Sequence, residues 1–276
     1  MSSADSGFSR GGPIAPERTW KRERFIRNPW LRRGLLVAIA AYMVYAAGAV
    51  DFDLARIMRG LPRAWDFIVR MFPPDYSIAH IIFSGTVESL QMAVVSTAAG
   101  ALLAIPVAIG GAVTIAPKPI YGLARGFIIL ARSFPPVLVA ILFVKAFGFG
   151  PFAGILTLTF ISIGFIGKLL AEAIENIDKG PIEAVQATGA GWFKVMLYGV
   201  APQVMPRYVG LSIYQLDINL RDSTIIGIVG AGGIGGALFN SFQRYEYDIS
   251  LAILIVIIAL VLVAEGVSGR IRSRIK

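Results

Sequence analysis

Long apolar runs separated by shorter polar stretches dominate the chain from residue 34 onward. A helix needs about 20 mostly apolar residues to cross the hydrocarbon core of a bilayer. The runs predict six such helices, at residues 34–51, 82–110, 121–146, 152–173, 207–238 and 249–267. The third contains Pro135 and Pro136, and we expect the fifth to be interrupted at residues 219–222 and in the glycine-rich stretch 227–236. The pattern therefore predicts an all-α membrane protein.

Two segments near the start of this pattern leave alternatives open. The small residues at 46–49 would also suit the end of a signal peptide, although 33 preceding residues are long for its basic region. Residues 52–78 place apolar side chains at helical spacing among four arginines. That spacing predicts an amphipathic helix on the outer membrane surface, ending before Pro73 and Pro74. An error of one in the number of crossing helices would fall in this segment.

Composition supports the membrane interpretation and excludes several kinds of site. Hydrophobic residues make up 56% of the chain and charged residues 16%, with a mean hydropathy of +0.70. Soluble domains usually carry about 25% charged residues. The chain has no cysteine and one histidine, His80, which excludes disulfides, thiol catalysis and a histidine-based zinc cluster. A membrane-embedded enzyme is therefore a poor alternative.

The formal charge of +9 reflects basic flanks, so we expect a lipid bilayer as partner and no nucleic acid. Residues 1–33 contain eight Lys or Arg and three acids, and residues 270–276 contain four more Lys or Arg. Basic flanks mark the cytoplasmic side, which predicts that both termini lie inside. The expected organisation is a cytoplasmic tail (1–33), a first crossing helix with an extracytoplasmic amphipathic segment (34–81), a core of five crossing helices (82–268) and a second cytoplasmic tail (269–276).

The polar loop at 174–206 within this core is longer than most connections between packed helices. Pro181 can begin a helix because its missing N–H has no partner in a first turn, and Glu183 then favours the helix dipole. Gly189 and Gly191 should end that helix, and an apolar segment then leads to Pro202. We expect a short helix, a turn and a second helix lying across the cytoplasmic face, where a partner protein docks.

The spacing of Glu183, Ala184, Gly189 and Pro202 resembles the EAA loop of ABC-importer permeases, although Val185, Gly199 and Ala201 depart from that pattern. Longer phrases are similar to the phosphonate-importer permease family. They lie at residues 72–75, 148–154, 168–175, 187–190, 198–206 and 229–235, and the resemblance covers about residues 72–270.

This resemblance implies a type I ABC-importer permease in the bacterial plasma membrane. It implies a homodimer, two cytoplasmic ATPase subunits that hold ATP and Mg²⁺, and an extracytoplasmic binding protein that delivers phosphonate or a related phosphorus oxyanion. The chain itself then has no cofactor and is not an enzyme. The residues implied to couple to the ATPases are Pro181, Glu183, Ala184, Thr188, Gly189, Ala190 and Pro202.

Polar residues inside the crossing helices are costly and indicate function. Arginine binds oxyanions with two parallel hydrogen bonds, so these residues are candidates for a translocation pathway. The candidates are Arg132, Ser133, Asn219, Arg221, Ser223 and Thr224. The alternative is structural: Arg221 pairs with an acid, and the hydroxyls donate to backbone carbonyls. A secondary carrier or channel for an anion would use similar residues, but it is expected to show an inverted repeat, and none is visible.

The glycine-rich stretch is interpreted as a site of close helix packing or a gate. Its candidate residues are Gly227, Gly230, Gly232, Gly233 and Gly235. Residues 230–235 also fit the dinucleotide fingerprint, but that pattern needs a preceding strand and a following acid about 20 residues on. Apolar segments of membrane-crossing length surround it here, so we expect no bound dinucleotide.

Overall fold

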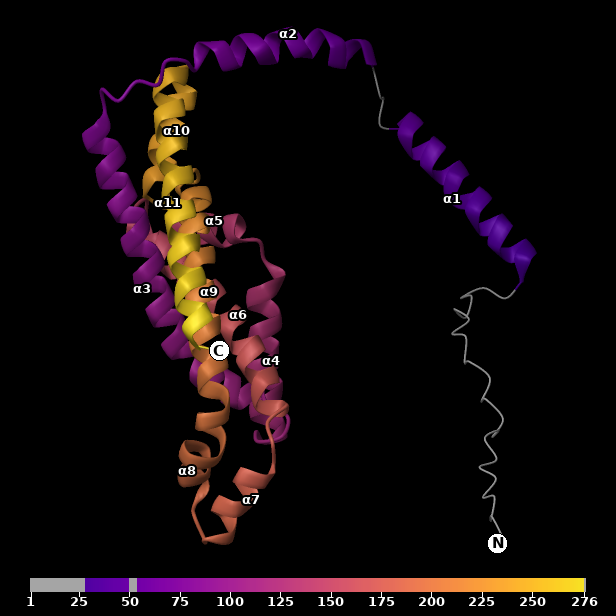
Figure 1. The fold of residues 1–276 in the computed structure, drawn as a ribbon, viewed down its shortest axis with the longest axis vertical. Coiled ribbons are helices and arrows are strands. Elements are labelled where there is room, and N and C mark those ends of the chain that lie inside the picture. The colour runs from indigo at the N-terminus through magenta and orange to yellow at the C-terminus, as the bar shows by residue number, and fades with distance from the viewer. Residues whose placement is uncertain (1–27, 50–53, 276) are drawn as a thin grey trace, which may run out of the picture. The chain divides into compact units, whose positions relative to one another are not determined.

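The computed structural model describes residues 28–49 and 54–275. Every regular element in these two ranges is a helix, so the predicted all-α class is confirmed. The chain divides after Pro62 into two units, and the second unit contains the helical bundle (Figure 1). The basic tail at 1–27 lies outside the described residues.

Two helices precede the bundle in sequence. Helix α1, Pro29–Ala49, is apolar and has no buried residue. Helix α2, Leu54–Arg70, is amphipathic as predicted: its four arginines share one face, while Leu61, Trp65 and Ile68 lie on the other. The ring of Phe67 near the end of α2 packs edge-on against Tyr247, with 4.8 Å between centroids.

Three long helices form the centre of the bundle, and a fourth packs beside them (Figure 1). They are α3 (Ala79–Gly111), α6 (Pro151–Glu175), α9 (Ala201–Gly227) and α11 (Tyr247–Ile275). Small residues allow α3 and α6 to approach closely, since a methyl group at Gly167 would lie 3.3 Å from Val107 Cγ1.

The third predicted crossing helix is broken, which corrects the expectation of one helix over 121–146. Helix α4 (Lys118–Ser133) and helix α5 (Pro136–Phe147) are bent by 98° relative to each other. Pro135 and Pro136 explain the break, because proline disfavours the helical conformation in the residue before it and lacks an N–H. Phe134 and Pro135 are both extended, with ψ of 132° and 145°.

The fifth predicted helix also differs from expectation. Helix α8 (Trp192–Val195), the π-helical segment η1 (Met196–Val200) and α9 form one continuous run that reaches Gly227 without a break at residues 219–222. The second half of the 174–206 loop is therefore the start of α9. The Ala201 N–H bonds to the Met196 carbonyl five residues back, a wider turn that accommodates Pro202.

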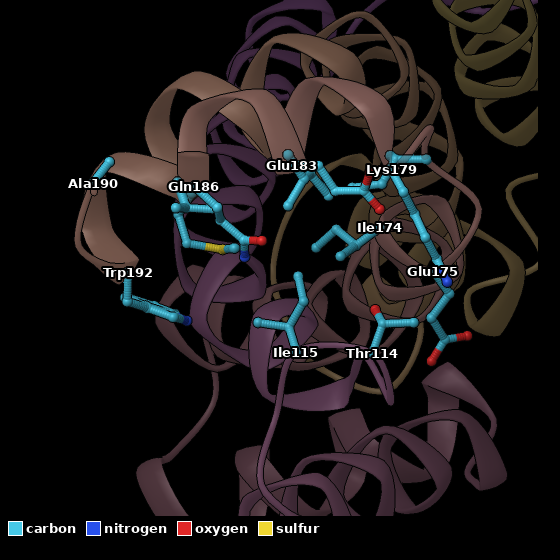
Figure 2. A pocket seen from close by; sticks show the side chains of 13 residues that line it. Thr114, Ile115, Ile174, Glu175, Lys179, Glu183, Gln186, Ala190 and Trp192 are labelled. Carbon is cyan, nitrogen blue, oxygen red and sulfur yellow. The ribbon is translucent and has the colours of Figure 1, made fainter. Parts of the chain in front are cut away.

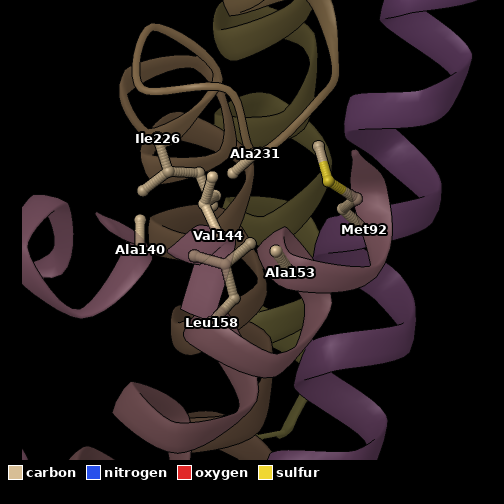
Figure 3. Close-up of a cluster of buried hydrophobic side chains, with 7 residues drawn as sticks. All are labelled: Met92, Ala140, Val144, Ala153, Leu158, Ile226 and Ala231. Carbon is tan, nitrogen blue, oxygen red and sulfur yellow. The ribbon is translucent and has the colours of Figure 1, made fainter. Parts of the chain in front are cut away.

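Helix α10 (Ile234–Gln243) follows α9 after a glycine turn at 228–233, at the end of the bundle opposite α7 and α8 (Figure 1). Apolar side chains from four elements meet beside that turn (Figure 3). Met92 comes from α3, Val144 from α5, Leu158 from α6 and Ile226 from α9.

Four described helices are long and apolar enough to cross a membrane: α1, α3, α6 and α11. The bent pair α4–α5 makes a fifth if it counts as one span. Helix α9 has sufficient length, 27 residues, but carries four charged residues. Its charges explain why apolarity alone does not identify it as a crossing helix.

Candidate functional sites

Most of the residues expected to contact a partner protein lie on one short hairpin, which we call the α7 hairpin (residues 176–195). Helix α7 spans Gly180–Ala187, with Pro181 and Glu183 in its first turn. It ends as predicted: the Thr188 hydroxyl donates to the Val185 carbonyl (2.7 Å), and the Gly189 N–H donates to the Gln186 carbonyl (2.9 Å). Gly189 has a φ of +75°, which glycine adopts without strain.

The hairpin lies at one end of the bundle (Figure 1). Glu183, Ala184, Thr188 and Gly189 are exposed, and Ala190 is half-buried. Pro202 lies apart from them, on the first turn of α9. The structure thus brings together all of these candidates except Pro202.

Gln203 joins the hairpin to α9 through its side-chain amide. Its Nε2 donates to the Gly199 carbonyl (2.7 Å) and the Asp178 carbonyl (3.1 Å), and its Oε1 accepts from the Asp178 N–H (3.0 Å). Gly199 lies against α7, because a methyl group there would approach Ile182 Cα to 3.3 Å. Gly199, where the chain departs from the EAA pattern, is therefore a position of close contact between α7 and η1.

A pocket of about 530 Å³ lies between the α7 hairpin and the ends of α3 and α6 (Figure 2). Its polar lining includes Lys179, Glu183 and Gln186 of the hairpin, together with Thr114 and Glu175. Apolar side chains, among them Ile115, Ile174 and Ile182, line the rest of the pocket, so the inner side of the hairpin is mixed in polarity.

Arg125 and Glu175 connect α3, α4 and α6 beside this pocket. Arg125 donates to the Gly111 carbonyl (2.8 Å) and to Glu175 Oε1 (2.8 Å), and the same carboxylate oxygen accepts the Val113 N–H (2.8 Å). These bonds satisfy backbone groups that a helix terminus leaves unpaired. They fix the ends of α3 and α6 against the middle of α4.

The pathway candidates on α9 divide between two faces. Asn219 is fully buried, where its Nδ2 donates to Thr97 (2.8 Å) and Ser162 (2.9 Å) and its Oδ1 accepts from Gln215 (2.9 Å). Ser223 shares that buried face and donates to the Leu220 carbonyl (2.7 Å). These two residues connect α9 to the bundle interior.

The opposite, exposed face of α9 carries Arg221. Its Nη2 lies 3.6 Å from Asp217 Oδ2, and 54% of its side chain is exposed. Thr224 is near this face with a half-buried side chain whose Oγ1 has no hydrogen-bond partner among the described residues. Tyr214 lies two turns before Arg221 on the same face.

Arg132 and Ser133 are exposed at the end of α4, next to the α4–α5 bend. The Ser133 hydroxyl donates to the Ile129 carbonyl (2.7 Å). The Arg132 guanidinium carbon lies 5.6 Å from the centre of the Phe165 ring on α6. The Phe165 ring in turn lies 5.8 Å from the ring of Tyr214 on α9.

The glycine turn is a tightly packed junction. Gly230, Gly232 and Gly233 have φ of +90°, +83° and +77°. A methyl group at Gly232 would approach Glu88 Oε1 to 2.6 Å, and one at Gly235 would meet the Thr224 carbonyl. The Ser89 hydroxyl accepts the Ile234 N–H (3.0 Å) and so ties the turn to α3. The turn joins two helices, whereas a dinucleotide fingerprint follows a strand.

Comparison with known families identifies the chain. The family described as the binding-protein-dependent transport system inner membrane component matches residues 100–276. The chain belongs to this family. Members are components of transport systems, so a transport role rather than an enzymatic one is supported.

Relatives within this transport family fall into a narrower group. The chain is 37% identical to the putative phosphite transport system permease HtxC of Stutzerimonas stutzeri over 86% of this chain and 84% of that protein. It is 36% identical to the phosphite permease PtxC of the same organism, over 90% of each. It is 45% identical to the phosphate-import permease PhnE of Mycolicibacterium smegmatis over 75% of this chain, but spans only 39% of that protein's length.

Solved structures of transport-family permeases share the fold. A chain of the inward-facing MetNI methionine ABC transporter matches with a TM-score of 0.64 and 23% identity, covering 73% of this chain and 99% of that one. A chain of an amino acid ABC transporter matches with a TM-score of 0.59 and 20% identity, covering 71% and 95%.

Several residues that organise these sites have no clear signal in the sequence. Gln203, Arg125 and Phe165 act on neighbours that are distant along the chain or belong to another helix. Glu175 lies in the polar loop at 174–206, where nothing sets it apart from the other charged residues. The signal for Arg125 and Glu175 is their position as charged residues near the ends of predicted helices.

Proposed function

We propose that this chain is the membrane-spanning permease subunit of an ATP-driven, binding-protein-dependent importer of phosphonate, phosphite or phosphate. The observation that carries the proposal is the extensive similarity to the Stutzerimonas phosphite permeases, over at least 84% of each relative. The exposed α7 hairpin supports it, because a permease without its own ATPase needs a surface through which ATP hydrolysis acts.

The proposed assembly contains two copies of this chain, two cytoplasmic ATPase subunits and one extracytoplasmic binding protein. The α7 hairpin serves as the coupling loop of a type I permease, with Glu183 and Gly189 in contact with an ATPase. ATP and Mg²⁺ belong to the ATPase subunits. Helix α9 is the sixth crossing helix despite its charges, which places both termini in the cytoplasm of a bacterial cell and the protein in its plasma membrane.

The mechanism is alternating access. Binding of ATP and docking of the loaded binding protein shift the balance between two arrangements of the permease pair. The Gln203 amide connects the α7 hairpin to α9, and the Arg125–Glu175 pair connects α6, at whose end the hairpin begins, to α4 and α3. Movement at the hairpin can therefore reach the crossing helices. The glycine turn at 228–233 acts as the gate at the opposite end of the bundle.

The translocation pathway follows the exposed face of α9. An arginine that faces lipid near the bilayer centre costs about 2.5–3.5 kcal/mol. Arg132 of α4 and Arg221 of α9 are both exposed, so the side of the bundle that carries them is better placed against water and the second copy than against lipid. Ser133 and Thr224 lie along the same pathway. Asn219 and Ser223 lie on the opposite, buried face of α9, which packs against the bundle interior.

A coupling variant tests the proposal. In the complete importer reconstituted in proteoliposomes, Glu183→Ala should lower ATP-driven uptake of phosphite while ATP hydrolysis by the complex continues. Glu265→Ala, an exposed acid on α11, is the matched control and should retain uptake. Normal uptake by Glu183→Ala would contradict the coupling role of the hairpin.

A further inference from the structure

Three helices meet in a stack of aromatic and cationic side chains on the exposed face of the bundle. The Arg132 guanidinium from α4 lies over the Phe165 ring of α6 at 5.6 Å, and Phe165 contacts the Tyr214 ring of α9 at 5.8 Å. A guanidinium stacked on a ring is attracted to its face. The aromatic pair therefore fixes the position of the charge at the point where α4 ends and the chain bends.

The charge of Arg132 has no counter-ion of its own. No carboxylate oxygen among residues 28–49 and 54–275 forms a salt bridge with it, whereas Arg221 lies 3.6 Å from Asp217 and Arg125 lies 2.8 Å from Glu175. No hydrogen bond from its guanidinium to another described residue is seen either. The guanidinium N–H groups of Arg132 are free to bind a ligand.

The geometry suits an oxyanion. The planar guanidinium can use its face for the ring while its edge directs parallel N–H groups at two oxygens of one anion. Arg221 is different, because Asp217 is buried and neutralises it. Arg132 thus has free N–H donors, is held in place by the Phe165 ring and lies on the proposed pathway face. These properties suit the binding of a tetrahedral anion.

We propose that Arg132, held by Phe165 and Tyr214, is the residue of this permease that binds the phosphorus oxyanion within the membrane. This inference rests on the proposed function. It assigns Phe165 as a positioning residue and leaves Arg221 paired with Asp217. A lipid phosphate has the same chemistry as the transported anion, so the test must separate the two.

The test uses the complete importer in proteoliposomes, with uptake of phosphite and inorganic phosphate and ATP hydrolysis measured together. Arg132→Gln should lower uptake by about tenfold or more, because it removes a charge-assisted pair of hydrogen bonds. Hydrolysis stimulated by the loaded binding protein should persist. Arg132→Lys should recover part of the uptake, and Phe165→Leu should lower it by a smaller factor than Arg132→Gln.

Lys168→Gln is the matched control, since Lys168 is a helical cation paired with Glu172 at 3.8 Å, and it should keep uptake near the wild-type rate. The Asp217→Asn/Arg221→Gln double variant removes the neighbouring ion pair and should lose less uptake than Arg132→Gln.

Four outcomes would overturn the assignment. The first is normal uptake by Arg132→Gln, and the second is an equal loss of uptake in Arg132→Lys and Arg132→Gln. The third is that Arg132→Gln loses stimulated hydrolysis together with uptake. The fourth is that Arg132→Gln changes only how the thermal stability of the importer depends on lipid. The last result would assign Arg132 to a lipid phosphate. If the wild-type importer takes up none of phosphite, inorganic phosphate and phosphonate, and none of them stimulates hydrolysis, the proposed function itself fails.

Discussion

At Gly227 a methyl group would lie 2.6 Å from the Gly232 carbonyl oxygen and 2.9 Å from Gly235 Cα. Backbone atoms cannot move aside as a flexible side chain can. We therefore expect Gly227→Ala to destabilise the protein in detergent by about 1–3 kcal/mol, as overpacking usually does. Thermal unfolding monitored by circular dichroism measures this effect.

Gly122→Ala provides the control for this residue. Gly122 lies within α4, and no atom approaches its Cβ position within 4 Å. Alanine should be neutral or stabilise the helix by up to about 1 kcal/mol. Equal stability of the two variants would show that the glycine turn is not closely packed.

Asn219 is a second residue whose substitution should act on stability. Asn219→Ala removes hydrogen bonds to Thr97 and Ser162 and leaves the Gln215 amide without its acceptor. Interhelical hydrogen bonds in membranes contribute about 0.6 kcal/mol each, so we expect a loss of about 1–3 kcal/mol including the cavity. Ser84→Ala removes an exposed hydroxyl that bonds only its own helix, and should change the unfolding free energy little.

Among the helices, Gln203 should couple movement of the α7 hairpin to movement of α9. Gln203→Leu removes all three hydrogen bonds between the side chain and the backbone of residues 178 and 199. We expect more ATP hydrolysed per anion imported, because the hairpin can then move without α9. Gln203→Glu should have the same effect, since it keeps the acceptor but loses both donors.

Gln243→Leu tests whether this effect is specific. Gln243 is exposed at the end of α10, remote in sequence from the hairpin, and its variant should keep the wild-type ratio of hydrolysis to uptake. If both Gln203 variants kept the wild-type ratio of ATP hydrolysis to uptake, the Gln203 amide would stabilise the loop without coupling it to α9.

The sequence predicts a helix correctly where an uninterrupted apolar run is long enough to cross the membrane. The segments 82–110, 152–173 and 249–267 correspond to α3, α6 and α11, and α11 continues beyond its predicted end to Ile275. The prediction was wrong where proline and polar residues had to be interpreted without their neighbours. Pro135 breaks the third helix, but Pro202 fits a π-helical turn, and Asn219 stays in α9 because other helices satisfy its amide.

At the scale of the whole molecule, the exposed face of α9 should be in contact with water in the assembled importer. The chain contains no cysteine, so a single cysteine can report on its surroundings. Ile225→Cys, one turn beyond Arg221, should react with a membrane-impermeant thiol reagent, since a thiolate forms only where water is present. Loaded binding protein with ATP should change the rate.

Leu262→Cys on α11 provides the comparison. Leu262 is 63% exposed in an apolar helix and should face lipid, where the thiol stays protonated and unreactive. Slow reaction at Ile225→Cys with fast reaction at Leu262→Cys would reverse the assignment of the pathway and lipid faces.

The candidate sites could be predicted only in part, because their chemistry depends on residues far apart in sequence. The α7 hairpin is local, and its limits followed from Pro181, Glu183 and Gly189. The distinction between Arg132 and Arg221 required the positions of Phe165 and Asp217 in space. The sequence indicates an acidic partner for Arg221, since Asp217 and Asp222 are close to it along the chain, but it gives no sign that Phe165 stacks on Arg132.

We propose that this chain carries phosphorus oxyanions with energy from partner ATPases. The most direct measurement is ATP hydrolysis by the chain purified with its ATPase and binding protein, with and without phosphite, phosphonate and phosphate. We predict stimulation that requires both the binding protein and one of these anions. Hydrolysis independent of both, or uptake driven by an ion gradient without ATP, would contradict the account.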